Sequence, residues 1–349
     1  MSNFTPNRRH VLAGIGATLA MPALISRSKA AELTLRLHHF LPAVSPMHKA
    51  FFEPWAKELS EASNGAIEVQ IFPAMQLGGK PPQLADQAKT GIADIVWALP
   101  TYTPGRFLVA ETMGLPFLNT TAEKTSVAVH KLMDEFGGNE FEGTKPLAFW
   151  SHAGGKMHMR DEPVRTAADL AGKKIRSPNA GMGELLVALG SDPVFFPVTD
   201  MVLGLSSGVI DGCCLPYEVV PAFKLQELTK FSSEAAPGAR GLYANTNVLL
   251  MNQERYEGLS DDLRGVIDAN SGIELSRRIG KTFDEFEEVG REVVKKQGNE
   301  IVEIPAEEIA KLAEAAKPVY ANWEAKLNEA GHDGAAILAR ANALLDQGA

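Results

Sequence analysis

Cysteine is scarce in this chain, whose 349 residues include only Cys213 and Cys214. Adjacent cysteines rarely form a disulfide with each other, because the bond strains the peptide between them. They also lack the spacing of a zinc or redox motif. The chain is therefore not a small domain held together by disulfides, and we expect both cysteines to be small buried hydrophobic residues.

Basic residues are outnumbered, with 34 Lys and Arg against 43 Asp and Glu and a net charge of -9. This balance argues against nucleic acid as a partner, because nucleic acid requires a basic face. A hydrophobic content of 45% and a charged content of 22% are typical of a globular protein. An acidic protein can still hold a small anion when one arginine lies in a cleft.

Long apolar runs are lacking after residue 30, so we expect no membrane-inserted segment in that part of the chain. Residues 1–30 differ, because the pair Arg8 and Arg9 precedes an uncharged apolar run and Ser28–Ala30 has the form of a cleavage site. This pattern predicts a signal peptide that resembles a twin-arginine signal, with an ordinary secretory signal as the alternative. We therefore expect an exported, periplasmic protein.

Strand and helix patterns alternate along the rest of the chain, which predicts an α/β protein with mostly parallel sheets. The alternation runs twice, with a break near residues 153–155. Two such halves behind a signal peptide predict a two-lobe binding protein of the venus-flytrap type, with its ligand in the cleft. The expected strands are residues 32–40, 66–73, 92–100, 146–152, 173–178, 193–197, 209–216, 242–252 and 300–305, and a helical tract runs from about Ser260 to Gly298.

Motifs for catalysis are weak. Residues 204–208 match G-x-S-x-G, but the serine would end a helix instead of following a strand, so we reject a nucleophile elbow and expect Gly208 to stop that helix. Gly181 and Gly183 open a helix, yet Leu186 stands where a dinucleotide loop has its third glycine. The histidines lack the spacing of metal ligands. We expect no catalytic residue, no cofactor and no metal site.

Arg176 lies at the carboxyl end of an expected strand and just before an expected helix. Side chains at such strand ends project into the crevice where α/β sheets bind ligands. Asn179 is placed to cap the helix, whose free N–H groups and positive dipole favour an anion. The stretch predicts a carboxylate clamp, with a structural salt bridge as the alternative.

Six segments have the order and spacing of one known family, namely Gly65–Gly79, Gly91–Pro100, Leu115–Leu118, Thr166–Gly181, Ser206–Gly212 and Leu259–Asp268. Through them the chain resembles the periplasmic solute-binding subunit of TRAP (tripartite ATP-independent periplasmic) transporters, the DctP-like family. The resemblance implies two α/β lobes with a long helix across both, and a membrane permease partner driven by an ion gradient. The lobes would comprise residues 31–152 plus about 242–284, and 153–241 plus about 285–349.

The resemblance also implies that Arg176 holds the ligand's carboxylate and that Asn179 makes another contact. Lys156 stands where sialic-acid-binding relatives have a second arginine, and Leu215 stands where the family often has an asparagine. The apolar wall at Leu215 favours an aromatic or hydrophobic monocarboxylate. The aromatic residues that we expect to contact such a ligand are Phe40, Trp97, Tyr102, Trp150 and Tyr217.

Other interpretations stay open. The ligand can instead be a sugar acid, a hydroxy acid or a C4-dicarboxylate, contacted by His39, His152, Lys156 and His158, with the aromatic residues mostly in the core. An exported enzyme acting on carboxylates is a different class, disfavoured by the rejected elbow and the missing cofactor signature. A sensor's ligand-binding partner would share the fold and differ in its docking surface.

Overall fold

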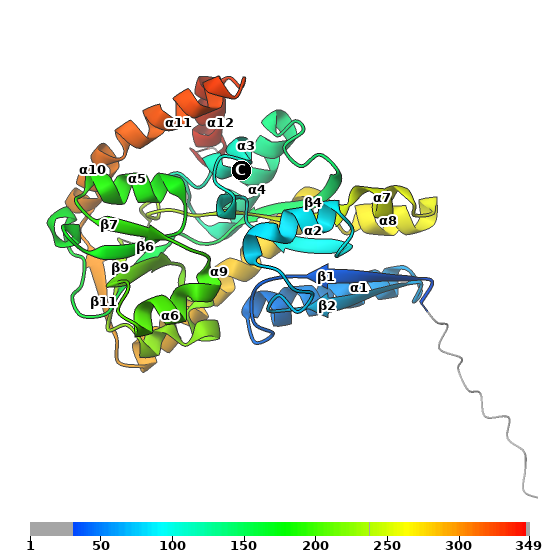
Figure 1. Cartoon of the computed structure of the whole chain (residues 1–349), viewed down its shortest axis with the longest axis horizontal. Coiled ribbons are helices and arrows are strands. Elements are labelled where there is room, and N and C mark those ends of the chain that lie inside the picture. The colour runs from blue at the N-terminus through cyan, green and yellow to red at the C-terminus, as the bar shows by residue number, and fades with distance from the viewer. Residues whose placement is uncertain (1–30, 237, 347–349) are drawn as a thin grey trace, which may run out of the picture. The chain divides into compact units, whose positions relative to one another are not determined.

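The computed structural model describes residues 31–236 and 238–346. In this part of the chain, two β-sheets are flanked by helices, so the α/β prediction is confirmed (Figure 1). None of the described helices has both the length and the apolar character needed to cross a membrane. The signal peptide predicted for residues 1–30 lies outside the described residues.

The first sheet has the strand order β2-β1-β3-β10-β4. Strand β1 pairs in parallel with β2 and β3, and β10 runs antiparallel between β3 and β4. Every residue of β3 and β10 is buried, as expected for central strands covered on both faces. The strands are β1 (Leu33–His38), β2 (Ile67–Phe72), β3 (Ile95–Ala98), β4 (Thr144–Ser151) and β10 (Thr246–Asn252).

The second sheet has the strand order β11-β9-β5-β8-β6-β7. Strand β6 pairs in parallel with β7 and β8, β9 pairs in parallel with β11, and β5 runs antiparallel between β8 and β9. The strands are β5 (Lys156–Met159), β6 (Lys174–Ser177), β7 (Asp192–Phe195), β8 (Gly212–Leu215), β9 (Phe231–Ala235) and β11 (Glu300–Ile304).

Both sheets are mixed, so the prediction of mostly parallel sheets was wrong for β5 and β10. Each of these strands follows a crossing from one sheet to the other, since β5 comes after β4 and β10 comes after β9. A local pattern of apolar residues reports the type of an element but not the sheet that it joins. The directions of β5 and β10 could therefore not be predicted from the sequence.

Strand β9 was not predicted, because its sequence contains two serines and a glutamate. Both serines are buried and satisfied by polar partners. The Ser232 hydroxyl lies 2.9 Å from Nδ1 of His158, and the Ser233 hydroxyl accepts a 3.0 Å hydrogen bond from the Val164 N–H. Such polar residues give no alternating apolar signal, although the sheet buries them.

The helical tract predicted from about Ser260 to Gly298 is two helices, α8 (Asp261–Ala269) and α9 (Gly272–Lys296). The Asn270 amide donates to the Val266 carbonyl at 2.9 Å, and the Ser271 hydroxyl donates to the Ile267 carbonyl at 2.7 Å. Because these side chains occupy carbonyls of the preceding turn, they help to end α8 before α9 begins.

Helix α9 has 25 residues and packs against elements from both halves of the chain. A Cβ at Gly280 would lie 2.6 Å from the Ala122 carbonyl oxygen at the start of α4, and a Cβ at Gly290 would collide with the Tyr217 carbonyl. Between these glycines, Asp284 accepts hydrogen bonds from the N–H groups of Ala122 and Glu123 at 2.7 and 2.9 Å. Close approach at two points thus ties α9 to α4 and to the 3₁₀ turn after β8.

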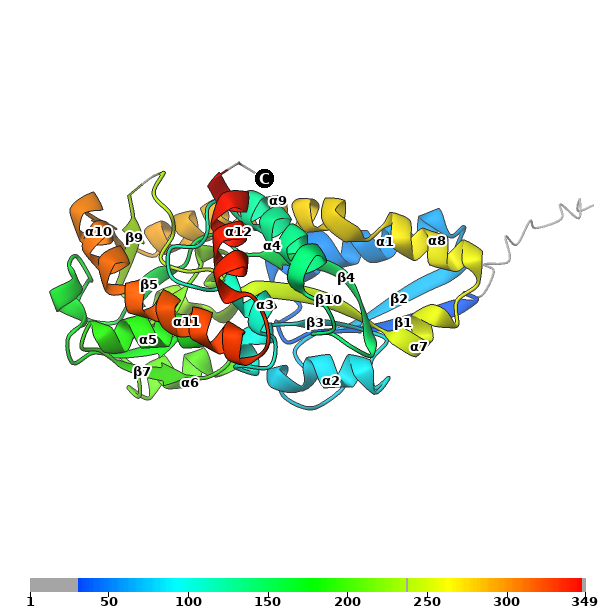
Figure 2. The ribbon, with the colours of Figure 1, turned by 90° about the horizontal axis from the view of Figure 1, so that it is seen from above.

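The remaining helices pack on the strands or against one another around the two sheets. Figure 2 shows α11 and α12 beside α3 and α4, and the Trp323 indole of α11 donates to the Thr112 hydroxyl of α3 at 3.0 Å. These helices are α1 (Glu53–Ala62), α2 (Leu84–Lys89), α3 (Leu108–Thr112), α4 (Ala122–Phe136), α5 (Ala180–Ala188), α6 (Met201–Ser206), α7 (Gln253–Glu257), α10 (Ala306–Ala315), α11 (Lys317–Glu329) and α12 (Gly334–Asp346).

Three smaller predictions are confirmed. Cys213 and Cys214 are free thiols buried in β8. Ser206 is the last residue of α6, and Gly208 follows with a φ of 71°, a left-handed conformation that suits glycine at a helix end. The G-x-S-x-G stretch therefore terminates a helix and does not form a nucleophile elbow.

Candidate ligand-binding site

A cavity with an empty volume of about 420 Å³ lies at the carboxyl ends of strands from both sheets. Phe40 follows β1 and Tyr102 closes the 3₁₀ turn after β3, so both come from the first sheet. Arg176 in β6 and Leu215 at the end of β8 come from the second. Ligands bind at this edge in α/β sheets, because side chains of neighbouring strand ends converge there.

Arg176 is the cation of this cavity. Its side chain is buried, with 2% of the residue exposed. Nε donates to the Phe196 carbonyl at 3.0 Å and Nη1 to the Cys214 carbonyl at 3.2 Å. No ion pair joins it to an acidic residue among the described residues. Two carbonyls fix the direction of the guanidinium but leave its charge uncompensated, and a buried uncompensated cation favours an anionic ligand.

The phenol of Tyr102 lies beside this guanidinium. Its oxygen accepts a 3.0 Å hydrogen bond from the N–H of Val198, which follows β7. Burial raises the pKa of Tyr102, although the positive charge of Arg176 opposes that rise. The phenol therefore keeps its proton at neutral pH, and its hydroxyl can donate a hydrogen bond to an anion held by Arg176.

Two side chains and one backbone carbonyl form a hydrogen-bonded chain along one wall. The Trp97 indole donates to Oδ1 of Asn247 at 2.9 Å, and the Asn247 amide donates to the Asn245 carbonyl at 3.1 Å. All three residues line the cavity. The bonds orient the Trp97 ring, whose centroid lies 4.6 Å from that of Phe40. Paired rings present flat apolar surface to the cavity.

Asn179 supports this wall from behind. Its Oδ1 accepts from the Met182 N–H at 2.7 Å, which confirms it as the N-cap of α5. Its amide donates to the Gly114 carbonyl at 3.0 Å and to Oδ1 of Asn245 at 2.8 Å. Since Asn179 is not among the lining residues, it positions Asn245 in this structure, and its contact with a ligand stays a prediction.

His152 lines the cavity as a neutral ring. Its Nε2 accepts from the Asn245 N–H at 3.0 Å, so Nδ1 carries the proton and donates to the Ala153 carbonyl at 2.5 Å. Burial, together with the charges of Lys156 and Arg176, lowers the pKa of His152 to about 4, although the hydrogen bond to Ala153 opposes the shift. With both ring nitrogens engaged, His152 supplies no charge for a second carboxylate.

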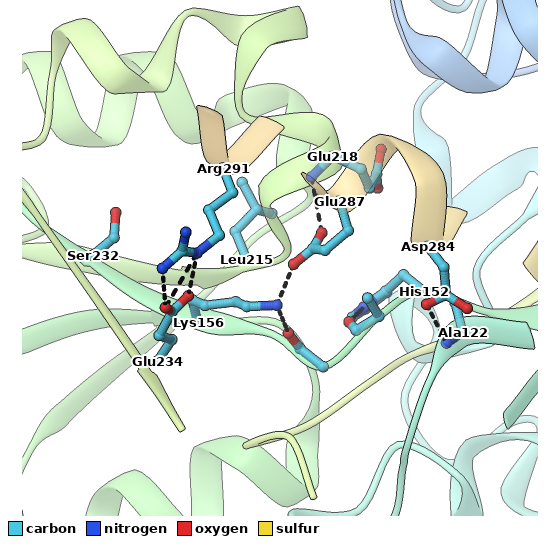
Figure 3. Close-up of polar contacts among 12 residues, drawn as sticks. Ala122, His152, Lys156, Leu215, Glu218, Ser232, Glu234, Asp284, Glu287 and Arg291 are labelled. Carbon is cyan, nitrogen blue, oxygen red and sulfur yellow. Dashed lines mark hydrogen bonds and ion pairs between the residues drawn. The ribbon is translucent and has the colours of Figure 1, made fainter. Parts of the chain in front are cut away.

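Lys156 and Tyr217 lie outside this cavity. The Lys156 ammonium pairs with Glu287 of α9 and donates to the Gly154 carbonyl at 2.6 Å (Figure 3). It also lies 5.1 Å from the centroid of the Tyr217 ring. Both residues line a wider depression that includes the Arg291–Glu234 ion pair and excludes Arg176.

His39 and Trp150 belong to the layer behind the cavity wall. The His39 ring stacks on Phe52 at 5.4 Å and bonds to Nδ1 of His48 at 2.9 Å. Trp150 packs against Trp97 at 5.8 Å. Neither lines the cavity. Of the predicted site residues, the structure therefore brings together Arg176, Tyr102, Phe40, Trp97 and Leu215.

Glu218 was missed by the sequence analysis. It is an acidic residue in the 3₁₀ turn Tyr217–Val219, lines the cavity and is 5% exposed. A single acid inside the apolar run 213–220 was the signal that could have identified it. Asn245 and Asn247 were also missed, since polar residues in a strand are more often at an exposed face.

A larger hollow, with an empty volume of about 1330 Å³, lies near the end of α4. Two of its titratable residues have partners, since His130 bonds to Ser276 at 2.9 Å and the Asp268 carboxylate accepts from the Tyr256 hydroxyl at 2.8 Å. Within residues 31–236 and 238–346, no three His, Cys, Asp or Glu side chains are grouped as metal ligands. The smaller cavity at Arg176 therefore remains the candidate site.

A buried cation in a cavity shared by two α/β sheets is the arrangement of a solute-binding protein. The family model described as "Bacterial extracellular solute-binding protein, family 7" (DctP) matches residues 37–326. This chain belongs to that family. The family predicted from the six sequence segments is thus confirmed.

Solved structures extend the comparison. A TRAP solute-binding protein from Rhodoferax ferrireducens T118, in complex with copurified benzoate, is 40% identical with a TM-score of 0.88, over 90% of this chain and 98% of that one. A marine metagenome TRAP protein specific for aromatic acid ligands, with 3-hydroxybenzoate, is 39% identical with a TM-score of 0.89, over 91% and 99%. The C4-dicarboxylate-binding periplasmic protein DctP of Rhodobacter capsulatus is 26% identical over 322 residues, 90% of this chain and 93% of that protein.

Proposed function

We propose that this protein binds an aromatic or hydrophobic monocarboxylate in the periplasm and delivers it to a TRAP-type secondary transporter. The observation that carries the proposal is Arg176, a buried guanidinium without an acidic partner among the described residues, in a cavity with aromatic walls. The carboxylate would pair with Arg176 and accept a hydrogen bond from the Tyr102 hydroxyl. The ring of the ligand would lie against Phe40, Trp97 and Leu215.

The ligands of the two solved relatives support this choice. Benzoate and 3-hydroxybenzoate are aromatic monocarboxylates, and both relatives share about two fifths of their residues with this chain. A C4-dicarboxylate, as in the name of the more distant DctP, would need further polar or cationic partners, and so would a sugar acid. Among the described cavity residues Arg176 is the single cation, His152 is neutral and Lys156 is paired elsewhere.

The route to delivery rests on the family. The lobes would be residues 31–152 plus about 242–284, and 153–241 plus about 285–349, which agrees with the membership of the two sheets. They would close over the bound anion, because contacts to the second lobe exist only in the closed state. A membrane permease would then accept the ligand. Export would use the twin-arginine route, and no chemical conversion of the ligand is expected.

A thermal-shift panel followed by calorimetry tests the proposal. Benzoate, 3-hydroxybenzoate, mandelate, succinate and galactonate are compared at equal concentration with protein purified from the periplasm. A ligand present at 100 times its Kd adds about 2.7 kcal/mol to the stability of the folded state. We expect the aromatic acids alone to stabilise the protein. Stabilisation by succinate or galactonate alone would contradict the ligand class, and mass spectrometry showing a converted ligand would contradict a binding role.

A further inference from the structure

Glu218 is a buried acidic residue to which the proposed function assigns no role. Its backbone N–H donates to Oε2 of Glu287 at 3.1 Å, which fixes the turn that carries it. Among the described residues, no hydrogen bond or ion pair to its carboxyl group is formed. The carboxyl group therefore lies beside the ligand cavity with no protein partner that would satisfy it.

Apolar side chains border this carboxyl group on one side. Beyond the main cavity it borders a smaller hollow formed by Met47 and by Thr282, Phe283 and Phe286 of α9. Figure 3 shows the Lys156 ammonium directed toward Glu287 and the Glu218 side chain pointing the other way. The nearest cation in the main cavity is Arg176, whose bonds run to carbonyl groups.

This environment favours the protonated form of the acid. Burial, and then the negative charge of Glu287, raise the pKa of Glu218 well above its usual value. A neutral carboxyl group both accepts hydrogen bonds through its carbonyl oxygen and donates one through its hydroxyl. Left without a partner in a closed site, it would cost about 1–3 kcal/mol.

We propose that Glu218 determines ligand specificity, by forming a hydrogen bond with a hydroxyl group on the ring of the bound monocarboxylate. This rests on the proposed function, because Arg176 has to hold the ligand's carboxylate for the ring to lie in the cavity. Sites built to hydrogen-bond a substrate hydroxyl discriminate strongly against the analogue without it, since their own polar group is then left unpaired. The preferred ligands are thus hydroxylated aromatic monocarboxylates.

The cavity disfavours a second carboxylate on the ring. Protonated Glu218 can donate one hydrogen bond to it but supplies no positive charge, so a second buried carboxylate would tend to take up a proton. No second cation lines the described cavity to offset that cost. A ring with two carboxylates would therefore bind worse than benzoate.

Calorimetry with four ligands tests the inference: benzoate, 3-hydroxybenzoate, 4-hydroxybenzoate and benzene-1,3-dicarboxylate. We expect wild type to bind at least one hydroxybenzoate about 10-fold more tightly than benzoate, and the dicarboxylate more weakly than benzoate. Glu218→Leu should lose the preference for the hydroxyl group and retain benzoate binding. Glu218→Gln, which keeps an acceptor and a donor, should retain most of that preference. Glu227→Gln, at an exposed position in the 3₁₀ turn Leu225–Glu227, is the matched control.

A pH series separates recognition from a structural role, even if Glu218→Leu does not fold. The titratable and charged groups around Glu218 are Arg176 of β6, Tyr102 after β3, His152 after β4, Lys156 of β5, and Asp284 and Glu287 of α9. Ionised Glu218 repels the ligand's carboxylate, so in a series from neutral to alkaline pH the wild-type affinity should fall where Glu218 loses its proton. Glu218→Gln should be flat over that range.

The outcomes separate the two proposals. If no aromatic carboxylate binds to wild type, the proposed function fails. If benzoate binds but a hydroxyl group at neither ring position increases the affinity of wild type, the role of Glu218 is contradicted while the proposed function stands. The same conclusion follows if the affinity of Glu218→Gln has the wild-type pH dependence.

Discussion

The phenol oxygen of Tyr102 accepts a 3.0 Å hydrogen bond from the backbone N–H of Val198. Tyr102 follows β3 of the first sheet and Val198 follows β7 of the second, so this bond crosses the cavity between the two sheets. Both residues line the cavity, and Tyr102 lies beside the guanidinium of Arg176. The bond can form only when the two strand ends face each other across the site.

Removing this hydroxyl should speed ligand release. Tyr102→Phe loses the hydrogen bond from the Val198 N–H and the hydroxyl that would donate to the ligand. Lost hydrogen bonding of roughly 1–2 kcal/mol should lower the affinity for benzoate about 10-fold. The larger part of the change should lie in the dissociation rate, measured by stopped-flow fluorescence. Tyr256→Phe, which removes a hydroxyl from an exposed bond to Asp268, is the control. An unchanged dissociation rate would show that the bond does not hold the site closed.

Arg176 should be required for binding and not replaceable by lysine. An ammonium group lacks the planar fork that pairs with both oxygens of a carboxylate, so Arg176→Lys should weaken binding about 100-fold, or roughly 3 kcal/mol. Calorimetry measures the affinity, and circular dichroism checks the fold. Arg165→Lys, at a half-exposed ion pair with Glu300, is the control. Near-wild-type affinity in Arg176→Lys would contradict the carboxylate clamp.

Lys156 should contribute to stability and not to ligand recognition. It pairs with Glu287, and both side chains are largely buried at 15% and 9% exposure. Lys156→Met leaves Glu287 without its cation, so the free energy of unfolding should fall by about 3 kcal/mol. Affinity for benzoate should stay within a factor of three. Lys230→Met, which breaks an exposed pair with Asp161, should change the stability little. A large loss of affinity with normal stability would instead place Lys156 at the ligand.

His158 should make the protein less stable in acid. Its Nε2 faces the Leu215 carbonyl at 3.1 Å, and burial lowers its pKa from 6.5 to about 4. The unfolded chain takes up the proton first as the pH falls, so the stabilisation is complete above pH 6.5 and is lost toward pH 4. The loss approaches roughly 3 kcal/mol.

The comparison with His158→Gln isolates this effect. Burial also raises the pKa of Glu111 to about 8, which makes the folded state less stable as the pH rises. This dependence is opposite to that of His158, and the measured pH profile of stability is the sum of both contributions. Between pH 7 and 4.5, His158→Gln should lose less stability than wild type in urea unfolding. His332→Gln, at a partly exposed position, should follow wild type. Parallel curves for wild type and His158→Gln would contradict the prediction.

The elements of this fold were largely predictable, because local pattern decides where strands and helices form. Arg176 near a strand end and Asn179 as a helix cap are such local features, and the structure confirms both. The sheet partners of β5 and β10 were not predictable, since they depend on where the chain crosses between sheets.

The site was only partly predictable. Phe40 and Trp97 line the cavity, whereas Trp150 packs one layer behind Trp97, although all three are buried aromatic residues near strand ends. Their residue types are equally suited to wall and core, so the sequence could not separate them. Glu218 was overlooked because its position depends on the turn after β8 meeting α9.

The turn that carries Glu218 is held against α9 at Gly290, where no side chain can be added without displacing the Tyr217 carbonyl. The shape of the pocket is therefore constrained from its rear surface, by a position that no ligand reaches. A substitution at Gly290 would push the acidic residue forward and alter ligand choice without touching the ligand. Divergence of ligand class among such proteins can proceed through the packing of this helix as well as through the cavity wall.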